Sequence, residues 1–242
     1  MLPAMNRIEV LRLLASRYRA RSYLEIGVKE GLTFFQVRVP RKIGVDPVLL
    51  IDLKARLRAA RRYLPNALSL LVEEASDDFF AHRAARLFSR RGIDLVFVDG
   101  KHTYEQALRD VRNALAHLSE QGVIVVHDTN PATPAEAWRA ESWEDAKASR
   151  PPGSNQAWCG DVWKALIHLR SELPGIGVRT VHSDHGVSVI NPRISDEPIG
   201  LEPSDVPALG FEDLDRSRES WLKTCGGEAI DAWIARDPAV RR

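Results

Sequence analysis

The sequence contains little cysteine, no long apolar run and almost no net charge. Its two cysteines, Cys159 and Cys225, lie far apart without the close spacing of a metal-binding pair, so we assign them no role and expect a reducing, cytoplasmic environment. No apolar stretch approaches the length that crosses a membrane, and Arg12 and Arg17 interrupt the first helical segment, so neither a membrane span nor a signal peptide is expected. The net charge of +1 argues neither for nor against a polyanionic partner.

The sequence also lacks the two common phosphate-binding motifs. A dinucleotide fingerprint needs G-x-G-x-x-G, whereas here three residues separate Gly27 from Gly31, and Glu25 stands where the first glycine belongs. A carboxylate at that position would repel a pyrophosphate. No G-x-x-x-x-G-K-[ST] segment occurs either. A nicotinamide-dependent reductase is therefore disfavoured, although it stays an alternative.

The first two predicted strands enclose a candidate nucleoside site. Residues 23–26 and 43–45 are short apolar runs next to glycine, a pattern typical of buried parallel strands. Gly27 and Gly31 allow the chain to turn tightly and to approach a ligand closely. Asp46 follows about 20 residues beyond the first glycine, where doubly wound folds hold a ribose. The alternative role of Asp46 is to cap a following helix.

Short apolar runs and amphipathic segments alternate along most of the chain, which predicts βαβ units and a parallel sheet. Residues 178–182 and 187–190 are joined by a tight turn, so the last strand is expected to be antiparallel. The predicted fold is α/β and Rossmann-like: a seven-stranded, mostly parallel sheet with a C-terminal antiparallel hairpin strand and helices on both faces. Further strands are expected at 67–72, 93–98 and 123–126, and helices at 8–18, 48–63, 77–90, 104–118, 161–173, 211–223 and 228–235.

The predicted organisation is an N-terminal helix within residues 1–21, a central domain over 22–191 and a C-terminal helical extension over 192–242. Within the central domain, residues 131–160 interrupt the alternation with several prolines and with tryptophans. A segment this long between a strand and a helix is usually functional, so we expect a lid over the site. Trp158 could stack on a ring of the substrate. The extension could cap the fold or join a homodimer.

Polar residues follow the predicted strands at the ends where doubly wound folds bind ligands. Ser76 and Asp77 follow the third strand and could meet the edge of an adenine, although Ser76 could instead cap the next helix. Asp184 and His185, in the hairpin turn, are expected at the same rim. The residues expected there are Glu25, Gly27, Gly31, Asp46, Ser76, Asp77, Asp99, His102, His127, Asp128, Asp184 and His185.

The acid-x-Gly-x-x-x-Gly pattern of residues 25–31 resembles motif I of class I S-adenosylmethionine-dependent methyltransferases. The segment Asp99-Gly-Lys-His-Thr-Tyr104 and the pair His127-Asp128 resemble one subgroup, which includes macrocin-type sugar O-methyltransferases and cephalosporin-hydroxylase-like proteins. The resemblance covers roughly residues 23–191. It implies S-adenosylmethionine as the cofactor, held by Glu25, Gly27, Gly31, Asp46, Ser76, Asp77 and Asp99.

The same resemblance implies a divalent cation, Mg²⁺ or another, bound by Asp99, His127 and Asp128. His127 stands where many metal-binding members have a carboxylate, which weakens the affinity expected for Mg²⁺. A cation at Asp99 and Asp128 would bind the acceptor oxygen and favour its alkoxide, so we count Asp99 among the catalytic residues.

The general base is a second departure from the subgroup. Lys101 stands where some members carry an acid in that role. His102 is the nearest substitute, because histidine titrates near neutral pH. His185 is the other candidate base. The alternative role of His102 is to orient the turn before the helix.

We therefore predict a methyltransferase that acts on a hydroxyl of a small molecule, a sugar or natural product, with His102, Asp99 and His185 as catalytic residues. One alternative is a nucleic-acid methyltransferase, because the helix at 48–63 carries a basic cluster that could track phosphates. Such a cluster is most often a solvated face. This basic cluster consists of Arg56, Arg58, Arg61 and Arg62. A second alternative is a catalytically silent, cofactor-binding partner subunit.

Overall fold

The structure is a computed structural model that describes residues 5–151 and 157–240. Residues 152–156 of the predicted lid lie outside the described residues. The chain divides into two compact units. The N-terminal unit comprises residues 7–100 and 109–125, and the C-terminal unit comprises, of the described residues, 5–6, 101–108, 126–151 and 157–240.

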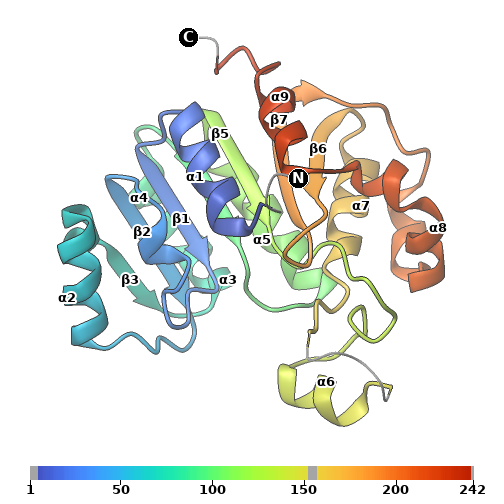
Figure 1. Cartoon of the computed structure of the whole chain (residues 1–242), viewed down its shortest axis with the longest axis horizontal. Helices are drawn as coiled ribbons and strands as arrows, with labels where there is room; N and C mark the ends of the chain where they lie inside the picture. The colour runs from blue at the N-terminus through green and yellow to red at the C-terminus, as the bar shows by residue number, and fades with distance from the viewer. Residues whose placement is uncertain (1–4, 152–156, 241–242) are drawn as a thin grey trace. The chain divides into compact units, whose positions relative to one another are not determined.

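The strands of the N-terminal unit lie in the order β3-β2-β1-β4-β5 (Figure 1). The pairs β1–β2, β1–β4 and β2–β3 are parallel. Every residue of β1 (Ser22–Ile26) and β4 (Ile93–Val98) is buried, as expected for parallel strands covered on both faces. The other strands are β2 (Arg41–Asp46), β3 (Leu70–Glu73) and β5 (Leu118–Val126), whose last residue belongs to the C-terminal unit.

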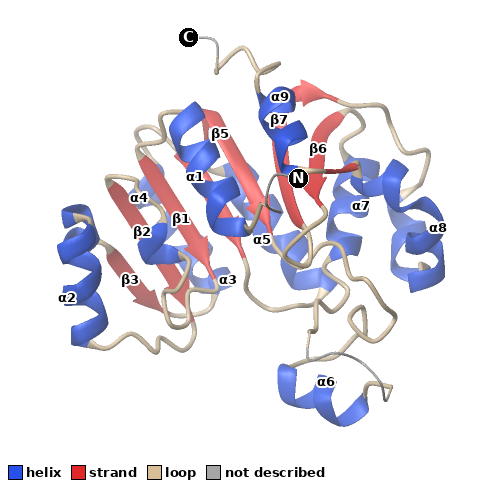
Figure 2. Ribbon diagram, in the orientation of Figure 1, coloured by secondary structure: helices blue, strands red, loops and turns tan. Residues whose placement is uncertain are grey.

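Helices cover both faces of these strands. α1 (Arg7–Arg17) contacts β4 and α3 (Ser76–Phe79) contacts β2, and Figure 2 shows the two helices on opposite sides of the strands. A π-helical stretch, η3 (Phe80–Ala84), joins α3 to α4 (Ala85–Phe88), so the helix predicted at 77–90 is one helical run with an irregular centre. The remaining helical elements are η1 (Phe34–Gln36), α2 (Leu53–Arg62), η2 (Leu64–Leu68) and α5 (Tyr104–Ala116), whose first turn belongs to the C-terminal unit.

α2 begins five residues later than the predicted helix. Its N-cap is Asp52, whose side chain accepts a hydrogen bond from the Ala55 N–H at 2.6 Å, the usual way in which an aspartate starts a helix. The leucines that the sequence places on one face of this helix do not enter the core: Leu53 is 71% exposed and Leu57 is 53% exposed. The buried residue of α2 is Ala59, on the other side.

The C-terminal unit contains the predicted hairpin. β6 (Ile176–Val181) and β7 (Val187–Ser195) pair in antiparallel register, because the short turn between the strands allows only a return in the opposite direction. A short strand, β8 (Thr224–Cys225), runs parallel to β6 on its other side. The helical elements of this unit are α6 (Trp143–Ser149), α7 (Trp163–Glu172), η4 (Pro203–Ala208), α8 (Phe211–Leu222) and α9 (Gly227–Ile234).

The predicted fold class is confirmed: strands and helices alternate, the strands are mostly parallel, and the hairpin strand is antiparallel. Further bounds differ within the described residues. β8 is an additional strand, and β3 begins at Leu70 instead of 67 because Pro65 lies in a 3₁₀ turn. β5 begins at Leu118 instead of 123, and β7 continues to Ser195 instead of ending at 190. None of the helices in the described ranges has both the length and the apolar composition of a membrane span.

Candidate active site

Gly27 lies where the chain leaves β1, directly against the end of β4. Its φ is +88°, and a Cβ atom built there would lie 2.0 Å from the Asp99 carbonyl oxygen. The Asp99 N–H donates to the Ile26 carbonyl at 2.9 Å, and the Gly27 N–H donates to the Val45 carbonyl at 2.9 Å. Two backbones therefore touch at this point, and only glycine leaves room for both.

Asp46 connects the loop after β1 to the loop after β2. Its Oδ2 accepts from the Lys29 N–H at 2.8 Å, and its Oδ1 accepts from the Val48 N–H at 2.8 Å. The bond to Val48 closes a local turn and is not a helix cap, because the cap of α2 is Asp52. A carboxylate offers about four acceptor positions, so Asp46 keeps acceptor capacity for the hydroxyls of a ribose.

Glu25 is buried inside β1, 1% exposed, and accepts a hydrogen bond from the Tyr23 hydroxyl. Burial raises the pKa of Glu25 from 4.5 to about 8, although the Tyr23 hydrogen bond and the charge of Lys42 oppose the rise. The sequence suggests a charged carboxylate at the strand end, whereas the structure places a neutral acid there at pH 7. A cationic group bound next to it would favour its ionised form.

Lys42 is a buried neighbour of Glu25 and was not among the predicted site residues. Its ammonium donates to the Phe34 carbonyl and, at 2.8 Å, to Asn66 Oδ1. Burial lowers the pKa of Lys42 from 10.5 to about 7, and the charge of Glu25 opposes this effect. A lysine directly before the apolar run of β2 was the available signal. Burial thus disfavours the charged form of both Glu25 and Lys42.

Ser76 and Asp77 lie at the start of α3. The N-cap residue of α3 is Ala75, so Ser76 does not take the capping role that was its alternative. Ser76 is buried, and the Asp77 carboxylate lies 3.4 Å from the Arg109 guanidinium. Asp99, at the end of β4, places a carboxylate oxygen 3.7 Å from Arg7. All seven residues predicted to bind the cofactor belong to the N-terminal unit.

A cavity of about 430 Å³ opens elsewhere in the N-terminal unit. Of the predicted cofactor residues, Gly31 alone lines it. Four guanidinium groups surround the cavity, and this charge suits an anion better than a sulfonium and an ammonium. The cavity is therefore a poorer candidate for the predicted cofactor than the strand ends. The guanidinium groups belong to Arg12, Arg38, Arg58 and Arg62.

In the C-terminal unit, His102 forms a dyad with Asp128. Its Nε2 lies 3.2 Å from Asp128 Oδ2, and its Nδ1 lies 3.0 Å from the Trp158 carbonyl oxygen. The Trp158 ring packs against the imidazole, with the ring centroids 5.0 Å apart. The segment that the sequence predicts as a lid therefore holds the histidine that the sequence predicts as a base. The role of Trp158 toward His102 was missed, because no local pattern reveals it.

Asp128 is the centre of a cluster of histidines and acids. It is 6% exposed, and its φ of 57° is unusual for a residue other than glycine. Burial alone would raise the pKa of Asp128. The interactions with His127, His102 and His185 lower this pKa by more than burial raises it, so the pKa of Asp128 lies below its ordinary value. Asp128 is thus a buried anion stabilised by imidazoles.

The hairpin turn contributes to the same cluster. His127 Nδ1 lies 3.1 Å from Asp128 Oδ2, and His127 Nε2 lies 3.7 Å from Asp184 Oδ2. The His127 and His185 rings meet edge to face, with centroids 6.4 Å apart. Both nitrogens of His127 therefore face carboxylates. Lys101, by contrast, pairs with Glu141.

These features define a class of protein. A parallel βαβ core with a glycine turn after its first strand and an acid at the end of its second is the architecture of nucleoside-binding α/β enzymes. The turn leads into η1, a single 3₁₀ turn, and not into an α-helix whose N-terminus could bind a pyrophosphate.

Comparison with known proteins makes the class specific. Residues 24–129 match a family model described as a methyltransferase domain. No curated protein matches the sequence. Residues 24–129 therefore resemble a methyltransferase domain, in agreement with the predicted class, and the fold of the chain is that of O-methyltransferases of known structure.

Three solved structures illustrate the fold. The O-methyltransferase TomG from Streptomyces achromogenes, involved in tomaymycin synthesis and solved with SAM, is 14% identical; the match covers 78% of this chain and 80% of that chain, with a TM-score of 0.51. A cofactor-bound protein from MTB is 17% identical over 78% and 80%, with a TM-score of 0.52. An O-methyltransferase family protein from Burkholderia thailandensis is 16% identical over 78% and 56%, with a TM-score of 0.50.

Proposed function

We propose that this chain transfers a methyl group from S-adenosylmethionine to a hydroxyl of a small molecule, a sugar or natural product. The observation that carries the proposal is the position of Asp46, which is tied by a hydrogen bond to the loop after β1 within the matched methyltransferase domain. The cofactor would supply a methyl group already activated by its sulfonium. The protein then has to hold the cofactor, orient the acceptor, exclude water and remove one proton.

The residues of the N-terminal unit fit such a cofactor. Asp46 would accept hydrogen bonds from the ribose hydroxyls, and the turn at Gly27 exposes backbone where a side chain would intrude. Glu25 is a buried acid that can ionise to meet an ammonium group. Ser76 and Asp77 remain the residues proposed for the adenine edge. Gly31 and Asp99 complete the set that we propose from the sequence.

Binding of S-adenosylhomocysteine tests the cofactor assignment. Asp46→Ala removes both ribose acceptors, so we expect binding measured by calorimetry to weaken by about 10- to 100-fold, the effect of losing one or two hydrogen bonds to a charged group. Asp52→Ala is the matched control: it removes the cap of α2, costing about 1 kcal/mol of stability, but should leave the affinity unchanged.

Two results would contradict the assignment. Equal affinity of wild type and Asp46→Ala would remove the ribose role. No binding by the wild type, together with a thermal shift on addition of NAD, would instead favour the nicotinamide alternative. Binding without turnover across a broad panel of acceptors would favour the silent partner subunit.

For the proton transfer we propose His102, with Asp128 as its partner. The Trp158 carbonyl accepts from Nδ1, so Nε2 carries the lone pair that would take the proton of the acceptor hydroxyl. Asp128 faces Nε2 in this structure, so its carboxylate would move aside to admit that hydroxyl and would stabilise the resulting imidazolium through its charge. His102→Gln should lower kcat by about 100-fold or more while the affinity for S-adenosylhomocysteine stays unchanged. His182→Gln replaces an exposed histidine of the hairpin and is the control. An unchanged kcat in His102→Gln would exclude the base role.

The divalent cation at Asp99, His127 and Asp128 also stays a proposal. A cation there would bind the acceptor oxygen and favour its alkoxide. Both His127 nitrogens already face acids, so His127 is the least available of the three proposed ligands. Full methyl transfer in the presence of a chelator would contradict this part of the proposal.

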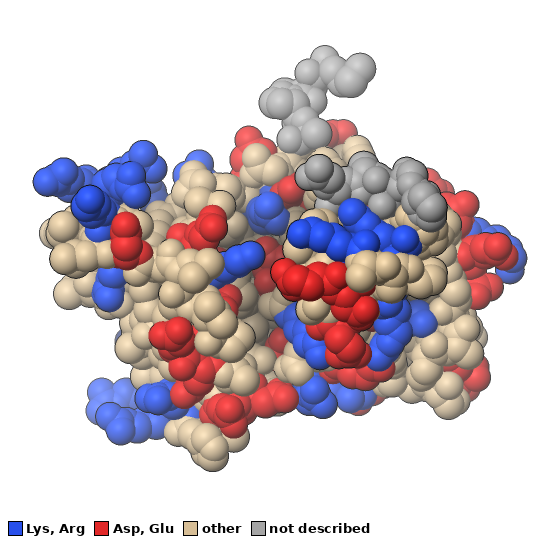
Figure 3. Space-filling model, turned by 90° about the horizontal axis from the view of Figure 1, so that it is seen from below, with Lys and Arg blue, Asp and Glu red and all other residues tan. Residues whose placement is uncertain are grey.

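The surface bears on the remaining alternatives. Figure 3 shows acidic and basic side chains interspersed, with Lys and Arg gathered at the left edge, the side on which α2 lies in Figure 1. A small basic cluster in a mixed surface supports a small-molecule acceptor over nucleic acid. The exposed Leu53 and Leu57 on α2 support the proposed homodimer. A solution mass equal to one chain would contradict it.

A further inference from the structure

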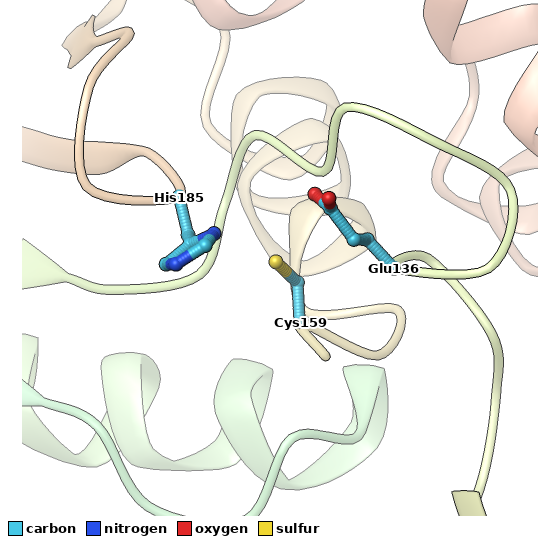
Figure 4. A group of neighbouring side chains, drawn as sticks. All are labelled: Glu136, Cys159 and His185. Carbon is cyan, nitrogen blue, oxygen red and sulfur yellow. The ribbon is translucent and has the colours of Figure 1, made fainter. Parts of the chain in front are cut away.

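Three potential metal ligands meet in the C-terminal unit, outside the residues considered so far for the cation. Glu136, Cys159 and His185 each place one ligand atom within 4.8 Å of the other two. Figure 4 shows their side chains converging from three separate segments, with the Cys159 sulfur between the carboxylate and the imidazole. Glu136 is 2% exposed and Cys159 is fully buried, whereas His185 is open to solvent.

The backbone fixes two of these residues to each other. The Glu136 carbonyl accepts hydrogen bonds from the Cys159 N–H at 2.8 Å and the Gly160 N–H at 3.1 Å. Gly160 has a φ of +63°, and a Cβ atom there would lie 1.9 Å from the His102 carbonyl oxygen, so the turn is seated closely against the start of α5. One Glu136 carboxylate oxygen, Oε2, accepts from the Ala132 N–H at 2.8 Å. These backbone contacts hold the main chains of Glu136 and Cys159 in place relative to each other.

The third ligand is fixed in a similar way. The Asn130 N–H donates to the His185 carbonyl at 2.9 Å, and the Thr129 N–H donates to the Gly186 carbonyl at 3.3 Å. A Cβ atom on Gly186 would lie 2.4 Å from Asn130. The hairpin turn is therefore packed against the segment after β5, which leads directly to Glu136.

The donor set has a definite preference among metals. A thiolate, an imidazole and a carboxylate are the ligands of zinc, with bonds of about 2.0 to 2.3 Å. Tetrahedral bonds of that length put ligand atoms about 3.3 to 3.8 Å apart, so the observed spacing needs to contract by only about 1 Å. A metal ion would also offset the cost of burying the Glu136 carboxylate.

We propose that Glu136, Cys159 and His185 bind a zinc ion. Three protein ligands leave a fourth position, as in zinc sites that bind water or a substrate oxygen, and His185 puts that position on the solvent side. Binding requires a thiolate, so the Cys159 sulfur loses its proton to solvent as the metal enters. The proposal concerns metal binding and does not depend on methyl transfer.

Cobalt substitution tests the site directly, because a thiolate bound to Co²⁺ gives a charge-transfer band in the near ultraviolet. We expect one equivalent of Co²⁺ to produce this band in the full chain and Zn²⁺ to abolish it. Cys159→Ser should remove the band. His185→Gln, at an exposed position, should weaken Zn²⁺ binding more than about 10-fold in competition with a chelator.

Two matched variants serve as controls. Cys225→Ser changes the other cysteine, and His182→Gln changes another exposed histidine of the same hairpin; both should bind like wild type. Absence of the charge-transfer band in folded wild type would overturn the proposal. A band that survives in Cys159→Ser, or Zn²⁺ affinity unchanged in His185→Gln, would overturn it as well. None of these three results bears on the methyl-transfer proposal, because metal binding is measured without cofactor or acceptor.

Discussion

Gly27→Ala is expected to destabilise the protein by about 3 kcal/mol or more. Two costs add at this position. The backbone conformation, with φ at +88°, costs a residue with a Cβ atom about 1 kcal/mol. The larger cost is steric, because the new Cβ would lie 2.0 Å from the Asp99 carbonyl oxygen and 2.7 Å from the Gly100 nitrogen. Backbone atoms cannot rotate away as a side chain can, so the end of β1 must separate from the end of β4.

Gly200→Ala separates the two costs. Gly200 has a similar φ of +69°, but a Cβ atom added there would meet nothing within 4 Å, so the variant should lose only about 1 kcal/mol. Urea unfolding followed by circular dichroism measures both variants. Equal losses in the two variants would mean that the contact between the strand ends is not rigid. Gly27→Ala should also weaken S-adenosylhomocysteine binding, because the same turn forms part of the proposed cofactor site.

Glu25→Gln should change the pH dependence of stability. The pKa of Glu25 is about 8 in the folded protein against an ordinary value of 4.5. Between these values the folded state holds a proton that the unfolded state has released. Stability from this group is therefore complete below about pH 4.5 and is lost as the pH rises toward 8. Between pH 5 and pH 7 the loss is about 2 to 3 kcal/mol.

The glutamine variant keeps a neutral group of the same shape and has no such loss. The free energy of unfolding of Glu25→Gln, taken relative to that of wild type, should therefore rise by about 2 to 3 kcal/mol as the pH is raised from 5 to 7. Lys42, with its pKa lowered to about 7, has the opposite sign and acts mainly above that pH, so this window isolates Glu25. Glu30→Gln, an exposed acid in the next loop, is the control. A difference between Glu25→Gln and wild type that does not vary with pH would refute the buried neutral acid.

Local patterns were sufficient for the order of the elements. Residues 93–98 were predicted as a strand and form β4 without change of bounds, because a mostly apolar run of that length has little choice but a buried strand. The antiparallel hairpin followed from the short turn between residues 182 and 187, which cannot reach across to a parallel strand.

Exposure was less predictable than element type. The spacing of Leu50, Leu53 and Leu57 indicates one helical face, but the structure leaves these leucines in solvent. Periodicity shows which residues share a face and not which neighbour, if any, covers it. In the same way, the presence of an acid before a helix did not distinguish Asp46 from Asp52, since the helix start depends on where the loop leaves the sheet.

By itself, the sequence determined the alternation of strands and helices and the antiparallel end, because these depend on short-range patterns of apolar and turn residues. The resemblance of its motifs to a known family pointed to the methyltransferase class. Only the tertiary structure decided that Glu25 is neutral at pH 7, that Trp158 holds His102, and that Glu136, Cys159 and His185 converge. Those properties come from burial and from contacts between segments far apart in the chain, and no local pattern encodes either of them.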